Sequence, residues 1–203
     1  MRGVFVTFEG IEGSGKSTQA ELFIQWLKKR KREILFLREP GSTSIGEEIR
    51  GILLSLEHKN FCPTAEFLLF LSARAQLVRE KIIPALEKGI IVILDRYSDS
   101  TLAYQGYGEG ISLELIKKLN YFATSGLNPD ITFLLDIEIE DGLKKAGLKD
   151  RIEKKGLEFH KKVQNGYYQL AASFNERMYV IKVQEDILET QKEIQCVFQE
   201  KFL

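Results

Sequence analysis

The stretch Gly10-Ile11-Glu12-Gly13-Ser14-Gly15-Lys16-Ser17 decides the fold of this chain. It matches the phosphate-binding pattern G-x-x-x-x-G-K-[ST], in which glycines let consecutive backbone N–H groups turn toward phosphate oxygens. The apolar residues 4–8 predict a buried strand before it, and Thr18 to Lys29 predict a helix after it. This context distinguishes a P-loop from a chance glycine-rich turn. We therefore expect a nucleoside triphosphate to bind residues 10–18, at the positive end of the helix dipole.

The residues of this motif predict distinct contacts with ATP. Lys16 is expected to reach the β- and γ-phosphates, and the Ser17 hydroxyl to bind Mg²⁺. Asp95 follows the apolar run Ile90–Leu94 and occupies a position similar to the acidic residue that holds Mg²⁺ through water in other P-loop enzymes. Lys16 and Asp95 are accordingly predicted catalytic residues, and Ser17 and Asp95 the metal ligands.

The composition limits the classes of partner. Lys+Arg and Asp+Glu both number 29, so the net charge is zero and the basic excess usual for a nucleic-acid binder is missing. Cys62 and Cys196 lie far apart and form no metal-type spacing. The longest aliphatic run, Ile90–Leu94, is far shorter than the ~20 residues that span a membrane, and we see no signal peptide. We expect a cytoplasmic protein without nucleic-acid or membrane partners.

Apolar runs and helical patterns alternate along the chain. This alternation predicts an α/β fold of three layers, with a five-stranded parallel sheet covered by helices on both faces, in a single domain of residues 1–203. The expected strands are residues 4–8, 34–37, 90–94, 131–135 and 179–183. The expected helices are residues 18–29, 45–55, 64–88 (capped by Thr64 and kinked near Pro84), 113–124 (capped by Ser112), 157–173 and 187–202. Residues 97–110 are expected to be a loop with short helical content. Ligands of such sheets bind beyond the carboxyl ends of the strands, where Arg38, Asp95-Arg96 and Asp136 are predicted to lie.

Several segments resemble the thymidylate kinases, in order from Phe8 to about Tyr167. They are Phe8-Glu9-Gly10, Arg38-Glu39-Pro40-Gly41, Thr64-Ala65-Glu66 with Phe70 and Arg74, the run from Leu94 to Gly106 (LDRYSDSTLAYQG), Asn128-Pro129-Asp130 and Asp150-Arg151-Ile152-Glu153. The resemblance implies a P-loop kinase fold, the reaction of ATP with dTMP to give ADP and dTDP, and a homodimer. The apolar helix at residues 64–88 and its neighbours could supply the dimer face.

Three arginines are candidates for the acceptor phosphate, because a planar guanidinium grips two phosphate oxygens at once. Arg96 follows a buried strand, and the resemblance assigns it this role; the alternative is a surface ion pair with Asp95. Arg38 and Arg50 are further candidates. Arg50 could equally be a solvated helix residue.

Phe70 and Arg74 lie four residues apart and share one helix face. The resemblance favours stacking of Phe70 on the base, whereas periodicity alone favours a core position. Arg74 could donate to thymine O4, where cytosine carries a donor instead. An arginine in so apolar a helix needs a buried partner in either case.

Further polar groups are predicted around the nucleotide. Ser100, Thr101 and Gln105 are candidate contacts to the base. Tyr104 either closes the space at the sugar 2′ position or serves in packing. Charge repulsion argues against a contact between Glu12 and phosphate. The resemblance implies instead that Glu12 contacts the acceptor 3′-OH or a metal-bound water. His58 and His160 have no catalytic partner at a recognisable spacing and are expected to be surface or helix residues.

Residues 142–156 are dense in charge and bounded by glycines, which predicts a lid segment that excludes water from the reacting phosphates. Its cations are Lys144, Lys145, Lys149, Arg151, Lys154 and Lys155. Arg151 is the expected catalytic cation, since the P-loop has no arginine and related bacterial enzymes carry theirs in the lid. Lysines stand at 144 and 145 where relatives often have arginines.

Other functions fit the sequence less well. A kinase for another nucleoside monophosphate or a deoxynucleoside would not need Phe70, Arg74 and the segment 95–105. A P-loop ATPase or GTPase switch that couples hydrolysis to a partner is a less favoured alternative, and a GTPase would carry an N-K-x-D motif, which this chain lacks. A binding module without turnover would not need Lys16, Ser17, Asp95 and Arg96.

Overall fold

Five parallel strands form one sheet, in the order β2-β3-β1-β4-β5. The computed structural model of the protein describes residues 2–58, 60–147 and 151–203. The strands are β1 (Phe5–Glu9), β2 (Ile34–Arg38), β3 (Ile91–Asp95), β4 (Ile131–Asp136) and β5 (Met178–Lys182). Each begins or ends within one residue of its predicted bounds. The central strand β1 is fully buried, because helices cover both faces of a parallel sheet.

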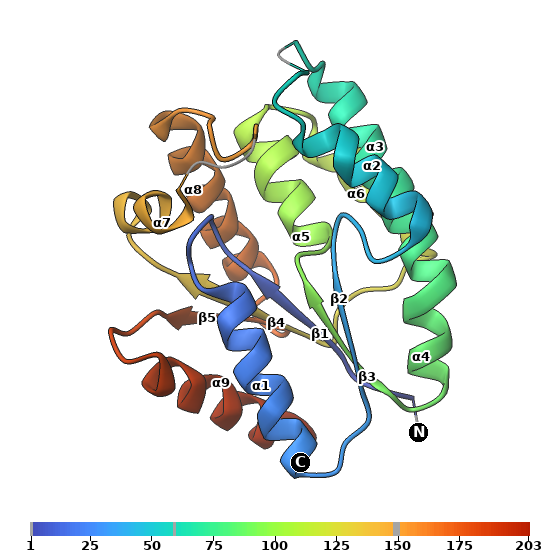
Figure 1. The fold of residues 1–203 in the computed structure, drawn as a ribbon, viewed down its shortest axis with the longest axis vertical. Helices are drawn as coiled ribbons and strands as arrows, with labels where there is room; N and C mark the ends of the chain where they lie inside the picture. The colour runs from blue at the N-terminus through green and yellow to red at the C-terminus, as the bar shows by residue number, and fades with distance from the viewer. Residues whose placement is uncertain (1, 59, 148–150) are drawn as a thin grey trace.

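Helices connect the strands and form the two outer layers (Figure 1). They are α1 (Lys16–Lys29), α2 (Ser44–Leu54), α3 (Pro63–Leu77), the π-helix η1 (Val78–Ile82), α4 (Ile83–Glu87), α5 (Ser98–Thr101), the π-helix η2 (Leu102–Gly108), α6 (Leu113–Thr124), α7 (Ile139–Ala146), α8 (Leu157–Ser173) and α9 (Ile187–Phe202). The predicted bounds of α8 and α9 are confirmed, and Ser112 caps α6 as predicted. None of the helices in the described ranges has the length and apolarity that a membrane crossing requires.

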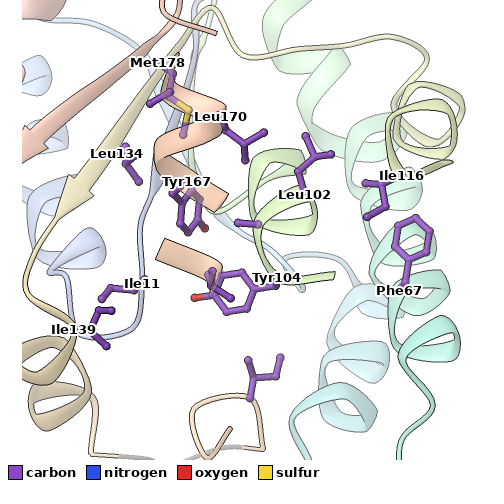
Figure 2. Close-up of a cluster of buried hydrophobic side chains, with 14 of the residues drawn as sticks. Ile11, Phe67, Leu102, Tyr104, Ile116, Leu134, Ile139, Tyr167, Leu170 and Met178 are labelled. Atoms are coloured by element: carbon purple, nitrogen blue, oxygen red, sulfur yellow. The ribbon is translucent and has the colours of Figure 1, made fainter. Parts of the chain in front are cut away.

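The apolar core has a layer on each face of the sheet. On one face, α1 and α9 lie side by side and pack Phe23 and Phe198 against Phe8 and Phe133 of the strands (Figure 1). On the other, α3, η2, α6 and α8 enclose a second cluster. Figure 2 shows Tyr104 of η2 and Tyr167 of α8 in that cluster, with Ile11 of the P-loop on one side and Phe67 of α3 on the other. This second cluster holds the P-loop against the helices that carry the residues predicted to bind the acceptor.

The expected helix at residues 64–88 was wrong in its start and in the cause of its interruption. The helix begins at Pro63, with Cys62 as the N-cap residue, so Thr64 is not the cap. Proline is favoured in the first turn because its missing N–H group has no partner there. The interruption is the π-helical segment Val78–Ile82, which ends before Pro84. Residues 97–110, expected to be mainly a loop, are mostly helical in α5 and η2.

Gly142 was predicted to bound the lid segment, but it lies inside α7 and is buried. A Cβ atom on Gly142 would lie 2.6 Å from the carbonyl oxygen of Glu12, and one on Gly13 would lie 1.9 Å from the carbonyl oxygen of Gly142. The two glycines therefore let α7 touch the P-loop backbone. Gly142 serves a close approach between two segments and not a loop boundary.

Candidate active site

A cavity of about 330 Å³ lies beyond the carboxyl ends of the strands, where ligands bind in sheets of this type. The ten residues predicted to bind the acceptor all line it: Glu12, Arg38, Arg50, Phe70, Arg74, Arg96, Ser100, Thr101, Tyr104 and Gln105. Gly13, Lys16, Ser17 and Asp95 line it as well, so the predicted donor and acceptor groups share one space. The other P-loop residues, Gly10, Ile11, Ser14, Gly15 and Thr18, form the rest of the loop and the start of α1.

The P-loop surrounds the side chain of Lys16. Gly15 has a φ of 86°, which a side chain would strain, and it leads directly into α1. The Nζ atom of Lys16 donates to the carbonyl oxygens of Gly10 at 3.0 Å and Ile11 at 2.7 Å. Burial, together with the charge of Arg96, lowers the pKa of Lys16 to about 8. A triphosphate in the loop would supply the negative charge that restores the fully protonated form.

Ser17 and Asp95 meet at the edge of the loop. The Ser17 hydroxyl, in the first turn of α1, donates to Oδ2 of Asp95, at the end of β3, at 2.8 Å. A hydroxyl and a carboxylate are oxygen ligands of the kind that Mg²⁺ prefers, and Mg²⁺ usually completes its octahedron with phosphate oxygens and water. The donor set at this edge fits the predicted ion.

Arg96 projects from the end of β3 with a backbone φ of 68°, a conformation that costs a non-glycine residue about 1–3 kcal/mol. Its Nη1 atom donates to Ser100 Oγ at 3.3 Å and Tyr167 Oη at 3.2 Å, and its Nη2 atom to Oε1 of Glu12 at 3.2 Å. The alternative pairing with Asp95 is not observed in the described structure. The guanidinium is held among buried groups and faces the cavity.

Glu9, at the end of β1, holds this turn in place. Its Oε1 atom accepts from the backbone N–H of Tyr97 at 2.7 Å, directly after the strained Arg96. Its Oε2 atom accepts from the hydroxyls of Ser100 at 2.5 Å and Tyr167 at 2.9 Å. Burial and the nearby charge of Asp99 raise the pKa of Glu9 to about 7. The hydroxyls of Ser100 and Tyr167 both donate their hydrogen bonds to Glu9. Their oxygen lone pairs are therefore left to accept from Arg96.

Glu12 is the centre of a second network. Its Oε1 atom accepts from Tyr104 Oη at 2.6 Å, and its Oε2 atom lies 3.3 Å from Nδ1 of His160. Burial acts to raise the pKa of Glu12, but the contact with His160 and the charges of Arg96 and Lys16 outweigh it and hold the pKa below its usual range. The prediction for His160 was therefore wrong in one respect: the residue lies in helix α8, but it is buried beside a carboxylate.

Arg74 has the buried partner that its apolar helix required. Its Nη2 atom forms an ion pair with Glu39 and donates to the Tyr97 carbonyl at 3.2 Å, and its Nη1 atom donates to Oδ1 of Asn120 at 2.5 Å. Its Nε atom is buried without a partner in the described structure. Phe70 is partly buried, packs against two apolar clusters and also lines the cavity. The packing of Phe70 against the core is therefore observed, and its stacking on a base stays a prediction.

The remaining arginines differ in their placement. Arg38 pairs with Glu47 at 3.0 Å in an exposed position, and Arg50 donates to the Pro40 carbonyl at 2.9 Å, so both line the cavity from β2 and α2. Arg151 is not among the lining residues: it forms an ion pair with Glu66 of α3 and donates to the Leu53 carbonyl.

Lys149 and Asp150, which belong to the predicted lid segment, lie outside the residues that the structure describes.

Sequence reasoning missed four groups that organise this cavity: Glu9, Glu39, Glu66 and His160. A signal was available for each of them. The three carboxylates lie in apolar surroundings or at the end of a buried strand, where an acidic side chain needs a partner. His160, Val163, Tyr167 and Leu170 follow one another at spacings of three, four and three residues, which marks the buried face of a helix.

Known proteins resemble this chain over nearly its whole length. The family model described as thymidylate kinase matches residues 8–194. A thymidylate kinase of Caldanaerobacter subterraneus subsp. tengcongensis is 50% identical over 194 residues, which cover 95% of this chain and 93% of that protein. One of Carboxydothermus hydrogenoformans is 51% identical over 174 residues, covering 84% and 85%. The crystal structure of thymidylate kinase from Ehrlichia chaffeensis superposes with a TM-score of 0.82 at 34% identity, covering 98% of this chain and 99% of that one. This chain belongs to the thymidylate kinase family.

Proposed function

We propose that this protein transfers the γ-phosphate of Mg-ATP to dTMP, giving ADP and dTDP, and that the residues lining the cavity carry out the transfer. The observation that carries the proposal is the meeting of a P-loop and ten candidate acceptor residues in one cavity. Both substrates are anions, so catalysis requires positive charge and in-line positioning more than covalent chemistry.

The donor site consists of the P-loop and its cations. Lys16 would exchange its carbonyl partners for β- and γ-phosphate oxygens, and the N–H groups at the start of α1 would bind the remaining oxygens. Ser17 and Asp95 would hold Mg²⁺, which neutralises part of the charge that develops on the transferred group.

The acceptor phosphate lies against Arg96 in this account. The two hydroxyls of Ser100 and Tyr167 and the carboxylate of Glu12 fix the guanidinium before a ligand arrives, so little reorganisation is needed on binding. Arg38 and Arg50 would approach the same phosphate from the other side of the cavity.

The base and sugar occupy the apolar part of the cavity. Phe70 would stack on thymine, and Arg74 would donate to O4, with Ser100, Thr101 and Gln105 as further polar contacts. Tyr104 would fill the space at the sugar 2′ position, and Glu12 would accept from the 3′-OH. A buried hydrogen bond left unmade costs about 1–3 kcal/mol, which is enough to disfavour cytosine in the same place.

We include three finer assignments in this proposal. Residues 142–156 form a lid segment of the single domain, and Arg151 provides its catalytic cation. The protein forms a homodimer through α2, α3 and α6, which carry exposed apolar residues including Ile52, Leu68 and Phe122. It acts in the cytoplasm, where its two unpaired cysteines would remain reduced.

The test is to identify the product directly. The protein is incubated with Mg-ATP and dTMP, and the nucleotides are separated by anion-exchange chromatography. Equal amounts of dTDP and ADP, with neither formed when dTMP is omitted, are expected. ADP without dTDP would mean that the protein hydrolyses ATP and would overturn the proposal. A Lys16→Ala variant is the matched control and should form neither product.

A further inference from the structure

Glu66 is a buried acidic residue in the first turn of α3, and it does not line the cavity. Only about 1% of its surface is exposed. Its Oε1 atom accepts from Nε2 of Gln105 at 2.8 Å, and its Oε2 atom accepts from Nη2 of Arg151. The Nζ atom of Lys155 lies 3.6 Å from Oε1. One carboxylate thus joins a residue of the cavity wall to two cations at residues 151–155.

The charge of Glu66 determines which end of the Gln105 amide faces it. A carboxylate paired with two cations has no proton to donate, so it can only accept hydrogen bonds. Gln105 must therefore turn its NH₂ group toward Glu66. Its carbonyl oxygen is then the end that it can offer to a molecule in the cavity, which Gln105 lines.

An acceptor at this position complements the donor on Arg74. Thymine presents an acceptor at O4 and a donor at N3–H, whereas cytosine presents a donor at the same exocyclic position and an acceptor at N3. Arg74 can only donate, and Gln105, oriented by Glu66, can only accept. The pair matches thymine at both atoms and cytosine at neither.

We propose that Glu66 is a specificity-determining positioning residue: it fixes the Gln105 amide so that its oxygen accepts from N3–H of the acceptor base. This inference rests on the proposed function, since it requires dTMP to occupy the cavity. Arg151 and Lys155 hold the same carboxylate from the side of residues 151–155.

The Glu66→Gln variant tests this proposal. In this variant, Arg151 would donate to the single amide oxygen of the new side chain at position 66. The NH₂ group of that new side chain would therefore face Gln105. Gln105 would then turn its own oxygen away from the cavity and present NH₂ to the base. The measurement is the ratio of the dissociation constants of 5-methyl-dCMP and dTMP, determined by isothermal titration calorimetry. The two ligands carry the same methyl group, sugar and phosphate and differ at N3 and the exocyclic group.

The ratio is expected to fall about tenfold in Glu66→Gln, which is the size of effect expected for one hydrogen bond. Glu109→Gln is the matched control: it removes the other ion-pair partner of Lys155 but makes no contact with Gln105, so its ratio should stay within twofold. In a Gln105→Leu background, Glu66→Gln should change the ratio no further, because the group that it orients is gone.

Three outcomes would contradict the inference or its basis. An unchanged ratio in Glu66→Gln, with both ligands weakened equally, would mean that Glu66 is only structural. If Glu66→Gln lowered the ratio in the Gln105→Leu background by as much as it does in the unmodified protein, the two residues would act independently. If the unmodified protein bound no dTMP, the proposed function itself would fail. Should Glu66→Gln not fold, Glu66→Asp is the second variant. Its shorter side chain keeps a carboxylate for Arg151 and Lys155 but withdraws that carboxylate from Gln105. The ratio of the two dissociation constants should fall in this variant as well.

Discussion

Nη2 of Arg96 lies 3.2 Å from Oε1 of Glu12, so the cation assigned to the acceptor phosphate is paired with the only carboxylate of the P-loop. The contact links the donor loop to the end of β3. It also places a negative group beside the proposed acceptor site, where it could accept a hydrogen bond from the sugar 3′-OH without occupying the phosphate position. In the proposed function, the two substrates would therefore be positioned by side chains that already contact each other.

Arg96→Lys should lower kcat/KM for dTMP at least 100-fold. A lysine supplies the same charge but cannot contact Glu12, Ser100, Tyr167 and a phosphate with one ammonium group. The dissociation constant of ATP should change less than threefold. Steady-state kinetics and calorimetry measure the two quantities. An equal loss in both would mean that Arg96 supports the fold of the site and not the acceptor.

Arg74→Ala should destabilise the protein by about 3–5 kcal/mol at pH 7, because it leaves Glu39 buried without its cation. Burial already raises the pKa of Glu39, despite the presence of Arg74. The double variant Arg74→Ala with Glu39→Gln should recover at least 1 kcal/mol, since the unpaired charge is removed. Urea unfolding measures both changes. A double variant no more stable than Arg74→Ala would contradict the importance of this pair.

Glu9 should make the unfolding free energy depend on pH. Its pKa is about 7 in the folded protein and 4.5 as its ordinary value, so the folded state binds more protons between these values. The stability contribution of Glu9 is greatest below about pH 4.5, falls as pH rises toward 7 and is constant above that.

The difference in unfolding free energy between the unmodified protein and Glu9→Gln isolates this effect from other titrating groups. Moving from pH 5 to pH 8, that difference should shift against the unmodified protein by about 2–3 kcal/mol. A difference that is independent of pH would show that Glu9 titrates as an ordinary carboxylate.

Arg151→Ala should lower kcat at least tenfold and leave KM for dTMP within threefold, if this arginine stabilises the transferring phosphate. To do so, Arg151 must leave Glu66, its partner in the present structure. Lys154→Ala, in the same segment, is the control and should behave like the unmodified enzyme. A rise in KM with unchanged kcat would instead assign Arg151 to the base pocket through Glu66.

The strands and most helices could be predicted because their apolar runs are continuous and their ends carry clear signals. Ser112 caps α6, and the bounds of α8 and α9 follow from the helical pattern. The π-helices could not be predicted, because they have the composition of α-helices and differ only in hydrogen bonding. The role of Gly142 was predicted wrongly because a close approach between two segments and a loop boundary both favour glycine. In this protein the glycine serves the close approach of α7 to the P-loop.

The cavity was predictable residue by residue, but its internal pairing was not. The motifs identify Arg96, Arg74 and Gln105 as candidates, since each lies at a recognisable position. Their partners Glu12, Glu39 and Glu66 lie about 35 to 85 residues away in the sequence, and only the fold brings them together. The carboxylates indicated that partners must exist without indicating which ones.

The most direct test of the central claim is ADP release with Mg-ATP across a panel of acceptors: dTMP, dUMP, dCMP, dGMP, dAMP, UMP, thymidine and none. We predict turnover mainly with dTMP, weaker turnover with dUMP, and release of ADP at least 100-fold slower with the other acceptors or with none. Equal ADP release with and without an acceptor would contradict it, and the roles assigned to Phe70 and Arg74 would fall with it.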